Sequence, residues 1–335
     1  MKFAINGFGR IGRTFFRSAY KLGLLPVAIN DLAPVDNLAY LLEYDSTYGR
    51  FQGEVKVQNG NFLVDGKEIK VFSEAEPQNL PWKELGVDLV IESTGVFREY
   101  DQAYNHIKAG AKQVVISAPY KGEKPMKTIV YGINHKDLSA DDKVFSMASC
   151  TTNCLVPVAK VLDDELGIEK ATLNTIHSFT MDQKLQDAPH KDFRRGRSAL
   201  QSIVPTSTGA AEATAKVLPS LEGKMDGYAF RVPTPTVSVI DFVALVKKET
   251  TEEEVRELFA EYAKKDQFLG ALKVTDEPVV SVDFRGEEAA SIVDLELIQV
   301  IEKNLVRVIA YYDNEMGYAA RLARLVDYIG KNVLA

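Results

Sequence analysis

The stretch KFAINGFGRIGR, residues 2–13, decides the fold of the first half of this chain. Residues 2–6 are typical of a short strand with an apolar centre, and glycines follow at once in the spacing Gly7-x-Gly9-x-x-Gly12. In a loop that joins a strand to a helix, Gly7 permits the tight turn, Gly9 lets the backbone approach a pyrophosphate, and Gly12 permits close helix–strand packing. Because the spacing occurs in this strand–loop–helix context, the stretch predicts a dinucleotide site.

The residues after the glycine loop complete a strand–helix–strand unit. Apolar residues at helical spacing run to Gly23, and a second apolar strand is predicted at 25–31. Asp31 ends that strand, 19 positions after Gly12. A carboxylate at this place can accept hydrogen bonds from a ribose diol and repels a 2′-phosphate. The sequence therefore favours NAD over NADP.

Two further apolar segments, 87–95 and 113–119, are typical of buried parallel strands that end in polar residues. Ligands of such sheets bind at the carboxyl ends of the strands. Thr94 and Ser117 are therefore candidates for contact with the dinucleotide, with ordinary turn chemistry as the alternative interpretation.

Alternating apolar residues predict several antiparallel strands. Residues 52–72 alternate around two Asx-Gly turns, which predicts hairpins inserted in the first domain. In the second half, 171–180 alternates and brings His177 near the end of a strand. The other strand patterns lie at 237–246, 278–285, 290–301 and 305–312. With a capped helix predicted at 251–265, these patterns indicate an α+β domain whose sheet is largely antiparallel, with helices on one face.

The composition limits the possible function classes. A chain of 335 residues with 46% hydrophobic and 26% charged residues is ordinary for a globular protein of two domains. The net charge of −7 and the lack of a basic tract argue against a nucleic-acid partner. No apolar run approaches the roughly 20 residues of a membrane span, and no signal-peptide pattern opens the chain. We expect no membrane association and a cytoplasmic protein.

The two cysteines, Cys150 and Cys154, are four positions apart and cannot build a disulfide framework. Neither belongs to a cluster with the spacing of zinc ligands, so we expect no metal. Cys150 stands where strand-like sequence gives way to a helical pattern. A thiol at a helix N-terminus feels the positive end of the helix dipole, which favours thiolate, and the unpaired N–H groups there can hold an anion. Cys150 is thus a candidate nucleophile, whereas Cys154 is interpreted as a small core residue.

The whole chain resembles the phosphorylating glyceraldehyde-3-phosphate dehydrogenases. The segments that carry the resemblance are INGFGRIGR (5–13), YDS (44–46), ASCTTNC (148–154), HKDFRR (190–195), PTSTGAA (205–211), RVPT (231–234) and YDNEMGY (312–318). It implies a Rossmann-type NAD-binding domain at 1–149, an α+β catalytic domain at 150–315, and a C-terminal helix, 316–335, that returns to the first domain. It also implies a homotetramer in which the loop 179–202 lines a neighbour's cofactor site.

The resemblance implies that Cys150 is the nucleophile and His177 the general base. The reaction is the oxidation of D-glyceraldehyde 3-phosphate to 1,3-bisphosphoglycerate with NAD and inorganic phosphate, through a thiohemiacetal and a thioester on the cysteine. The implied cofactor-binding residues are Gly7, Gly9, Arg10, Ile11, Gly12, Asp31, Thr94, Ser117 and Asn314. The implied phosphate-binding residues are Thr180 and Arg231 for the substrate, Ser149, Thr151, Thr208 and Gly209 for inorganic phosphate, and Arg195 for both.

Some positions depart from the family pattern. Met147 replaces a common asparagine, and Ala75 stands where an arginine often flanks the adenine. Leu32 and Pro189 are typical of strictly NAD-dependent members, whereas Ala188 is typical of relatives that use NADP. We predict a preference for NAD with incomplete discrimination.

Two rival functions remain open. An erythrose-4-phosphate dehydrogenase would share the fold and the Cys150–His177 pair, but the retained Thr208-Gly209 favours a site for inorganic phosphate. A non-catalytic NAD-binding scaffold is the rival of another class, and the intact Cys150 and Arg231 argue against it. The reaction would serve glycolysis or gluconeogenesis.

Overall fold

The computed structural model of the chain describes residues 1–334. The described chain divides into two compact units: residues 1–129, 134–148 and 322–334 form the first, and residues 130–133 and 149–321 form the second. Among the described residues, no helix combines the length and apolar character needed to cross a membrane.

The first unit is built on a single eight-stranded sheet in the order β10-β9-β8-β1-β2-β7-β6-β5. Its strands are β1 (Phe3–Asn6), β2 (Ala28–Asn30), β5 (Val55–Gln58), β6 (Asn61–Val64), β7 (Lys67–Phe72), β8 (Leu89–Glu92), β9 (Gln113–Ile116) and β10 (Val144–Ser146). Strands β10 to β7 pair in parallel, whereas β7, β6 and β5 pair antiparallel. Its helices are α1 (Arg10–Lys21), α2 (Val35–Glu43), α3 (Trp82–Leu85), α4 (Tyr100–Ala103) and α5 (Asn105–Lys108).

The parallel strands form because their sequences are apolar on both faces. Every residue of β1, β8 and β9 is buried, as expected for strands covered by helices on both sides. Strand β1 lies between β2 and β8. The chain passes from β1 to β2 on one side and later enters β8 on the other side, so the direction of strand order reverses at β1. The crevice at the carboxyl ends of β1 and β8 is therefore the switch point at which such sheets bind ligands.

The hairpins predicted at 52–72 are confirmed. Strands β5 and β6 are joined at Asn59-Gly60, and β6 and β7 at Asp65-Gly66. All four turn residues have positive φ, the conformation that two-residue hairpin turns of this type require. The hairpins extend the main sheet, because β7 also pairs in parallel with β2.

The second unit contains the other large sheet, in the order β12-β13-β11-β14-β18-β16-β15, with β17 paired to β18. Its strands are β11 (Ile168–Ser178), β12 (Val204–Ser207), β13 (Met225–Val232), β14 (Ser238–Val246), β15 (Leu272–Thr275), β16 (Ser291–Asp294), β17 (Gln299–Ile301) and β18 (Leu305–Tyr312). Its helices are α6 (Cys150–Leu166), α7 (Ala210–Val217) and α8 (Glu252–Tyr262), and α9 (Met316–Asn332) begins in this unit. Most neighbours are antiparallel; β11–β13 and β15–β16 are parallel.

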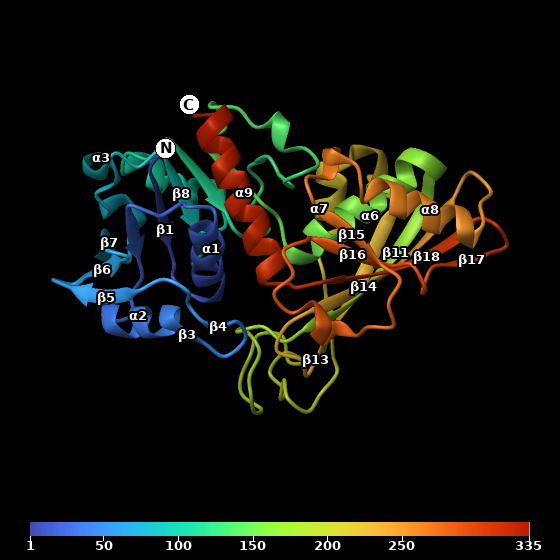
Figure 1. Cartoon of the computed structure of the whole chain (residues 1–335), viewed down its shortest axis with the longest axis horizontal. Coiled ribbons are helices and arrows are strands. Elements are labelled where there is room, and N and C mark those ends of the chain that lie inside the picture. The colour runs from blue at the N-terminus through green and yellow to red at the C-terminus, as the bar shows by residue number, and fades with distance from the viewer. Residues whose placement is uncertain (335) are drawn as a thin grey trace. The chain divides into compact units, whose positions relative to one another are not determined.

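The helices α6, α7 and α8 lie over the same face of this sheet (Figure 1). Side chains of α6 such as Leu155 and Leu162 pack with Phe242 of β14 in one buried apolar core. The predicted capped helix begins at Thr251, whose hydroxyl accepts from the Glu254 N–H in a reciprocal capping box. The predicted fold class, a Rossmann-type domain with a largely antiparallel α+β domain, is confirmed.

The strand predicted at 278–285 is wrong. Residues Ser281–Phe284 form a 3-10 helix, and the Asp283 carboxylate accepts from the Val280 N–H at 2.8 Å. This side chain offers the backbone a local partner, and the alternating valines Val280 and Val282 stay exposed instead of covering a core. Strand β15, which the sequence pattern missed, lies earlier in the chain.

Candidate functional site

The glycine loop between β1 and α1 is shaped by close backbone packing. A Cβ on Gly7, which has φ +92°, would lie 2.5 Å from the Thr94 backbone nitrogen, and one on Gly12 would lie 2.2 Å from the Gly7 carbonyl oxygen. Both contacts are too short for any side chain, so these two glycines are required by the fold itself. A Cβ on Gly9 would meet nothing within 4 Å, and Gly9 lines a cavity.

That cavity, of about 350 Å³, lies at the switch point of the first sheet. Its walls are Asn6, Gly7, Gly9, Asn30, Asp31, Leu32, Glu74, Ala75, Ser93, Thr94, Val96 and Phe97. Asp31 is held in place by two backbone donors, because its carboxylate accepts from the N–H groups of Phe8 at 2.7 Å and Ala33 at 2.9 Å. No side chain caps the N-terminus of α1, so the N–H groups of its first turn can bind an anion.

These features fit a dinucleotide. Gly9 leaves space for a pyrophosphate against the first turn of α1, where Arg10, Ile11 and Gly12 present their N–H groups. The Asp31 carboxylate in the wall suits the hydroxyls of a ribose. Asn314, predicted to bind the same cofactor, belongs to the second unit.

Five predicted cofactor residues are not among the cavity walls: Arg10, Ile11, Gly12, Ser117 and Asn314. The Arg10 guanidinium forms an ion pair with the buried Asp45. The group of Arg10 that can contact a ligand in the cavity is therefore its backbone N–H. Ser117 follows β9, and its N–H donates to the Glu92 carbonyl at 2.9 Å.

The cysteine–histidine pair lies in the second unit. Ser149 caps α6 by accepting from the Thr152 N–H at 3.0 Å, which places Cys150 in the first turn of the helix. His177 reaches the thiol from β11, with its Nε2 3.4 Å from the Cys150 Sγ. The pairing of β11 with β13 brings Arg231 directly opposite His177. The structure therefore brings together three predicted residues that are far apart in the sequence.

The protonation of His177 follows from its contacts. Its Nδ1 lies 2.7 Å from the Ser178 carbonyl oxygen, which can only accept, and 3.0 Å from Arg231 Nη1, which can only donate. Because Arg231 Nη1 carries two hydrogens and donates to the Ser178 carbonyl and to the Thr180 hydroxyl, we assign the proton between the ring and the carbonyl to His177 Nδ1. Nε2 then presents a lone pair to the thiol. Burial and the Arg231 charge lower the pKa of His177 to about 3, which keeps the imidazole neutral at pH 7.

The thiol differs from the sequence-based expectation. A helix N-terminus was expected to favour the thiolate, but burial raises the pKa of Cys150 above its ordinary value. The nearby Arg231 charge and a hydrogen bond from the Thr151 backbone lower it in part. The packing around the sulfur therefore acts against the thiolate, whereas the helix end and the Arg231 charge act for it. Burial likewise raises the pKa of Cys154, which lies in the core as predicted.

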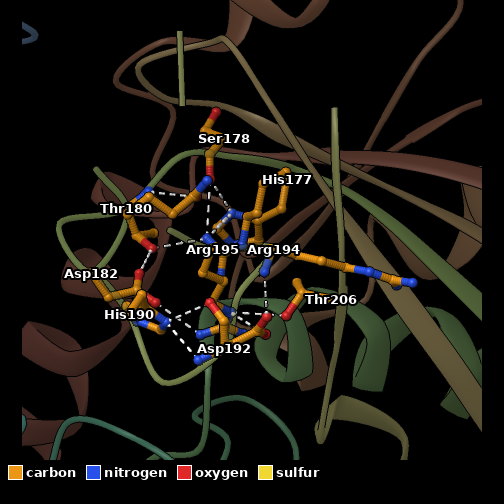
Figure 2. A network of polar contacts seen from close by, with 11 residues as sticks. His177, Ser178, Thr180, Asp182, His190, Asp192, Arg194, Arg195 and Thr206 are labelled. Atoms are coloured by element: carbon orange, nitrogen blue, oxygen red, sulfur yellow. Dashed lines mark hydrogen bonds and ion pairs between the residues drawn. The ribbon is translucent and has the colours of Figure 1, made fainter. Parts of the chain in front are cut away.

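A candidate anion site is formed by Arg231, Thr180 and Arg195. Arg231 Nη1 donates to the Ser178 carbonyl and the Thr180 hydroxyl, each at 3.1 Å, and its Nε is buried with no hydrogen-bond partner. The Asp182 carboxylate links Thr180 to Arg195, because it accepts hydrogen bonds from the Thr180 hydroxyl and from Arg195 Nη1 (Figure 2). A buried donor with no partner is costly unless a ligand satisfies it.

The residues predicted for inorganic phosphate lie at the N-termini of two helices. Ser149 and Thr151 belong to the start of α6, and Thr151 exchanges a hydrogen bond with the Tyr312 hydroxyl at 2.8 Å. Thr208 and Gly209 precede α7. In the described part of the chain, no hydrogen bond joins these two pairs.

Three contributors were missed by the sequence analysis: Asp182, Tyr312 and Ser238. The Tyr312 ring packs edge-on against the His177 imidazole, with centroids 6.0 Å apart. The Ser238 hydroxyl donates to the Asn314 amide oxygen at 2.9 Å and accepts from the Ser178 N–H at 3.1 Å. Ser238 thereby orients the side-chain amide of Asn314. Tyr312 and Ser238 act through partners distant in sequence, so no local pattern could reveal them. Asp182 lies two residues from Thr180, and that spacing is its local signal.

The fold and the site define a class: an oxidoreductase that has a dinucleotide-binding unit and a cysteine–histidine pair beside a buried arginine. Residues 1–100 match the glyceraldehyde 3-phosphate dehydrogenase NAD binding domain, and residues 149–314 match the C-terminal domain of the same family. The chain belongs to the glyceraldehyde-3-phosphate dehydrogenase family.

Similar proteins come from plants and bacteria. The chain is 52% identical to the chloroplastic glyceraldehyde-3-phosphate dehydrogenase A of Zea mays, over 98% of this chain and 82% of the relative. It is 49% identical to the glyceraldehyde-3-phosphate dehydrogenase of Clostridium acetobutylicum, over 98% of both chains. It is also 49% identical to that of Geobacillus stearothermophilus, over 100% of this chain and 99% of the relative.

Proposed function

We propose that this protein oxidises D-glyceraldehyde 3-phosphate to 1,3-bisphosphoglycerate, with NAD as cofactor and inorganic phosphate as the second substrate. The observation that carries the proposal is the contact of 3.4 Å between the Cys150 sulfur and the unprotonated nitrogen of His177. A nucleophile beside a base, next to an unsatisfied arginine, suits attack on an aldehyde that bears a phosphate.

Cys150 attacks the aldehyde carbon, and the resulting thiohemiacetal carries a hydroxyl group. His177 Nε2 accepts the proton of that hydroxyl as the thiohemiacetal is oxidised to a thioester, because a neutral imidazole is available at pH 7. NAD, when bound, accepts the hydride that this oxidation releases. Inorganic phosphate then attacks the thioester carbonyl, and the acyl phosphate leaves with release of the Cys150 sulfur.

The two phosphates occupy separate subsites in the proposal. Arg231 and Thr180 bind the phosphate of the substrate, and the buried unpaired Nε of Arg231 supports this assignment. Ser149, Thr151, Thr208 and Gly209 bind inorganic phosphate through the two helix N-termini. Arg195 supports both subsites, and Asn314 binds the nicotinamide carboxamide.

The proposal also includes three further points. The protein is a homotetramer, the boundary between its two domains lies at residues 149–150, and it is located in the cytoplasm. Exposed apolar side chains on the loop after β11 support self-association: Met181, Leu185 and Phe193 are 84%, 64% and 89% exposed. Two free cysteines fit a reducing compartment. A sedimentation mass near that of one chain would refute the tetramer.

The test is NADH formation from glyceraldehyde 3-phosphate and NAD, with and without inorganic phosphate, beside Cys150→Ser. Steady turnover that requires phosphate and is lost in the variant supports the proposal. One burst of NADH per site, or turnover that ignores phosphate, indicates thioester hydrolysis instead. Erythrose 4-phosphate would then be the substrate to try.

A further inference from the structure

A buried polar network lies directly beneath the dinucleotide cavity and has no part in the chemistry proposed so far. Its centre is Glu92, the last residue of β8, which is 2% exposed and is not a wall of the cavity. Its Oε2 accepts from Asn6 Nδ2 at 2.6 Å and lies 3.1 Å from His106 Nε2. Its Oε1 accepts from the N–H of Thr94 at 2.9 Å and from the Thr94 hydroxyl. Asn6 and Thr94 are cavity walls.

The direction of each hydrogen bond on the His106 side is fixed by an indole. Trp82 Nε1 can only donate, and it lies 2.9 Å from His106 Nδ1. Nδ1 must therefore be the unprotonated nitrogen, and the proton lies on Nε2, which donates to Glu92. Asn6 Nδ2 is also 3.4 Å from Nε2, but it makes its shorter contact, at 2.6 Å, with Glu92. His106 and Trp82 are fully buried, so water cannot replace either bond.

The direction on the Asn6 side is fixed by backbone groups. Asn30 Oδ1 accepts from the Glu74 N–H, and Asn30 Nδ2 donates to the Glu74 carbonyl, both at 2.9 Å. The same Nδ2 donates to Asn6 Oδ1 at 2.7 Å, which leaves Asn6 Nδ2 to donate to Glu92. Reversal of the Asn30 amide would set donor against donor at the Glu74 N–H, and reversal of the Asn6 amide would set donor against donor at Asn30 Nδ2.

The hydrogen bonds that begin at Trp82 and those that begin at Glu74 therefore both end at Glu92. Both carboxylate oxygens of Glu92 must accept hydrogen bonds. Only a carboxylate without a proton can do so; a glutamine would place an NH₂ group against Asn6 and His106 or against the Thr94 N–H. We infer that Glu92 is a positioning residue for the cofactor site, and that with His106 it holds the side chain of Asn6 and the backbone of Thr94 at the places where they meet the dinucleotide. The inference rests on the proposed function, because it deepens the dinucleotide site of that proposal.

The test is NAD binding by calorimetry to the full-length protein and its variants, with kcat and KM for NAD and the thermal midpoint measured on each. Glu92→Gln is expected to raise the Kd and KM for NAD about tenfold or more, because it leaves buried donors facing each other. At saturating NAD, kcat is expected to change less than about threefold, since the reacting groups are untouched. Glu92→Asp, which keeps the acceptors, should recover part of the affinity. The matched control is Glu84→Gln, an exposed carboxylate of the same unit.

A second pair of variants decides the matter if Glu92→Gln does not fold. His106→Gln can still accept from Trp82 and donate to Glu92, whereas His106→Leu can do neither. Weaker NAD binding in His106→Leu than in His106→Gln supports the inference. The inference is overturned if both His106 variants bind NAD with wild-type affinity. It is also overturned if Glu92→Gln binds NAD with wild-type affinity and shows only a lowered thermal midpoint. Failure of the wild-type protein to bind NAD at all would instead overturn the proposed function.

Discussion

The His177 ring is oriented by the carbonyl of its own neighbour, because Nδ1 donates to the Ser178 oxygen at 2.7 Å. Many catalytic histidines are oriented by a carboxylate, which stabilises the imidazolium form. A neutral carbonyl gives much less of that stabilisation, and Arg231 Nη1, 3.0 Å from the same nitrogen, opposes it. The arrangement favours a neutral base over an ion pair with the thiol.

The first prediction concerns the pH dependence of thiol reactivity. The pKa of Cys150 is raised by burial, so alkylation by iodoacetamide should accelerate as pH rises above neutrality. His177, with a pKa of about 3, should add no inflection between pH 5 and 8. Arg231→Gln removes a charge that lowers the thiol pKa and should move the midpoint up by about one unit or less. Cys150→Ser gives the background from Cys154, and an inflection near pH 6 contradicts the neutral-base assignment.

The second prediction concerns the substrate subsite. Asp182→Asn should raise the KM for glyceraldehyde 3-phosphate, because the carboxylate that holds both Thr180 and Arg195 is lost. Arg231→Gln should raise it further, by about tenfold or more, since a charge-assisted contact to phosphate disappears. Asp187→Asn is the matched control, because Asp187 pairs with an exposed Arg197 in the same loop. Equal KM values in all three variants would refute the subsite.

The third prediction separates two glycines of the same loop. Gly12→Ala should lower the thermal midpoint, because its Cβ would lie 2.2 Å from the Gly7 carbonyl oxygen. Gly9→Ala should fold nearly as well as the wild type, since its Cβ meets nothing within 4 Å. That methyl group enters the cavity and should weaken NAD binding, which calorimetry measures directly. Undiminished NAD affinity in Gly9→Ala would place the pyrophosphate elsewhere.

The fourth prediction concerns the choice of cofactor. The Asp31 carboxylate is fixed by two backbone donors in the cavity wall and should repel a 2′-phosphate, so kcat/KM should be higher for NAD than for NADP. Asp31→Asn should reduce the ratio of the two constants by about tenfold, as expected for loss of one nearby charge. Ala188 is the sequence feature that makes us expect some use of NADP by the wild type. An equal or better constant for NADP would overturn the preference.

Local sequence was a good guide wherever short-range geometry determines structure. The glycine loop, the hairpins at Asn59-Gly60 and Asp65-Gly66 and the capped start of α8 each depend on a few adjacent residues. The strand predicted at residues 278–285 is wrong because alternating apolar side chains do not specify a strand unless a neighbouring strand is available to pair with it. There the Asp283 side chain supplies the backbone with a partner instead.

The electrostatics of the site could not be obtained in the same way. The position of Cys150 at a helix start was correctly predicted, but the packing that raises its pKa is not visible in the local sequence. Helix-end fields are local, but burial depends on every element packed around the sulfur. The unsatisfied Nε of Arg231 is hidden from sequence for the same reason.

The sequence by itself determined the two-part architecture, the dinucleotide loop and the placement of the candidate nucleophile at a helix N-terminus, because each is specified by contiguous residues. Only the tertiary structure decided that His177 faces Cys150, that Arg231 lies opposite His177, and that Asn6 and Thr94 converge on Glu92. These relationships depend on strand order and register. Those are set by the packing of whole sheets and helices, and no single segment encodes them.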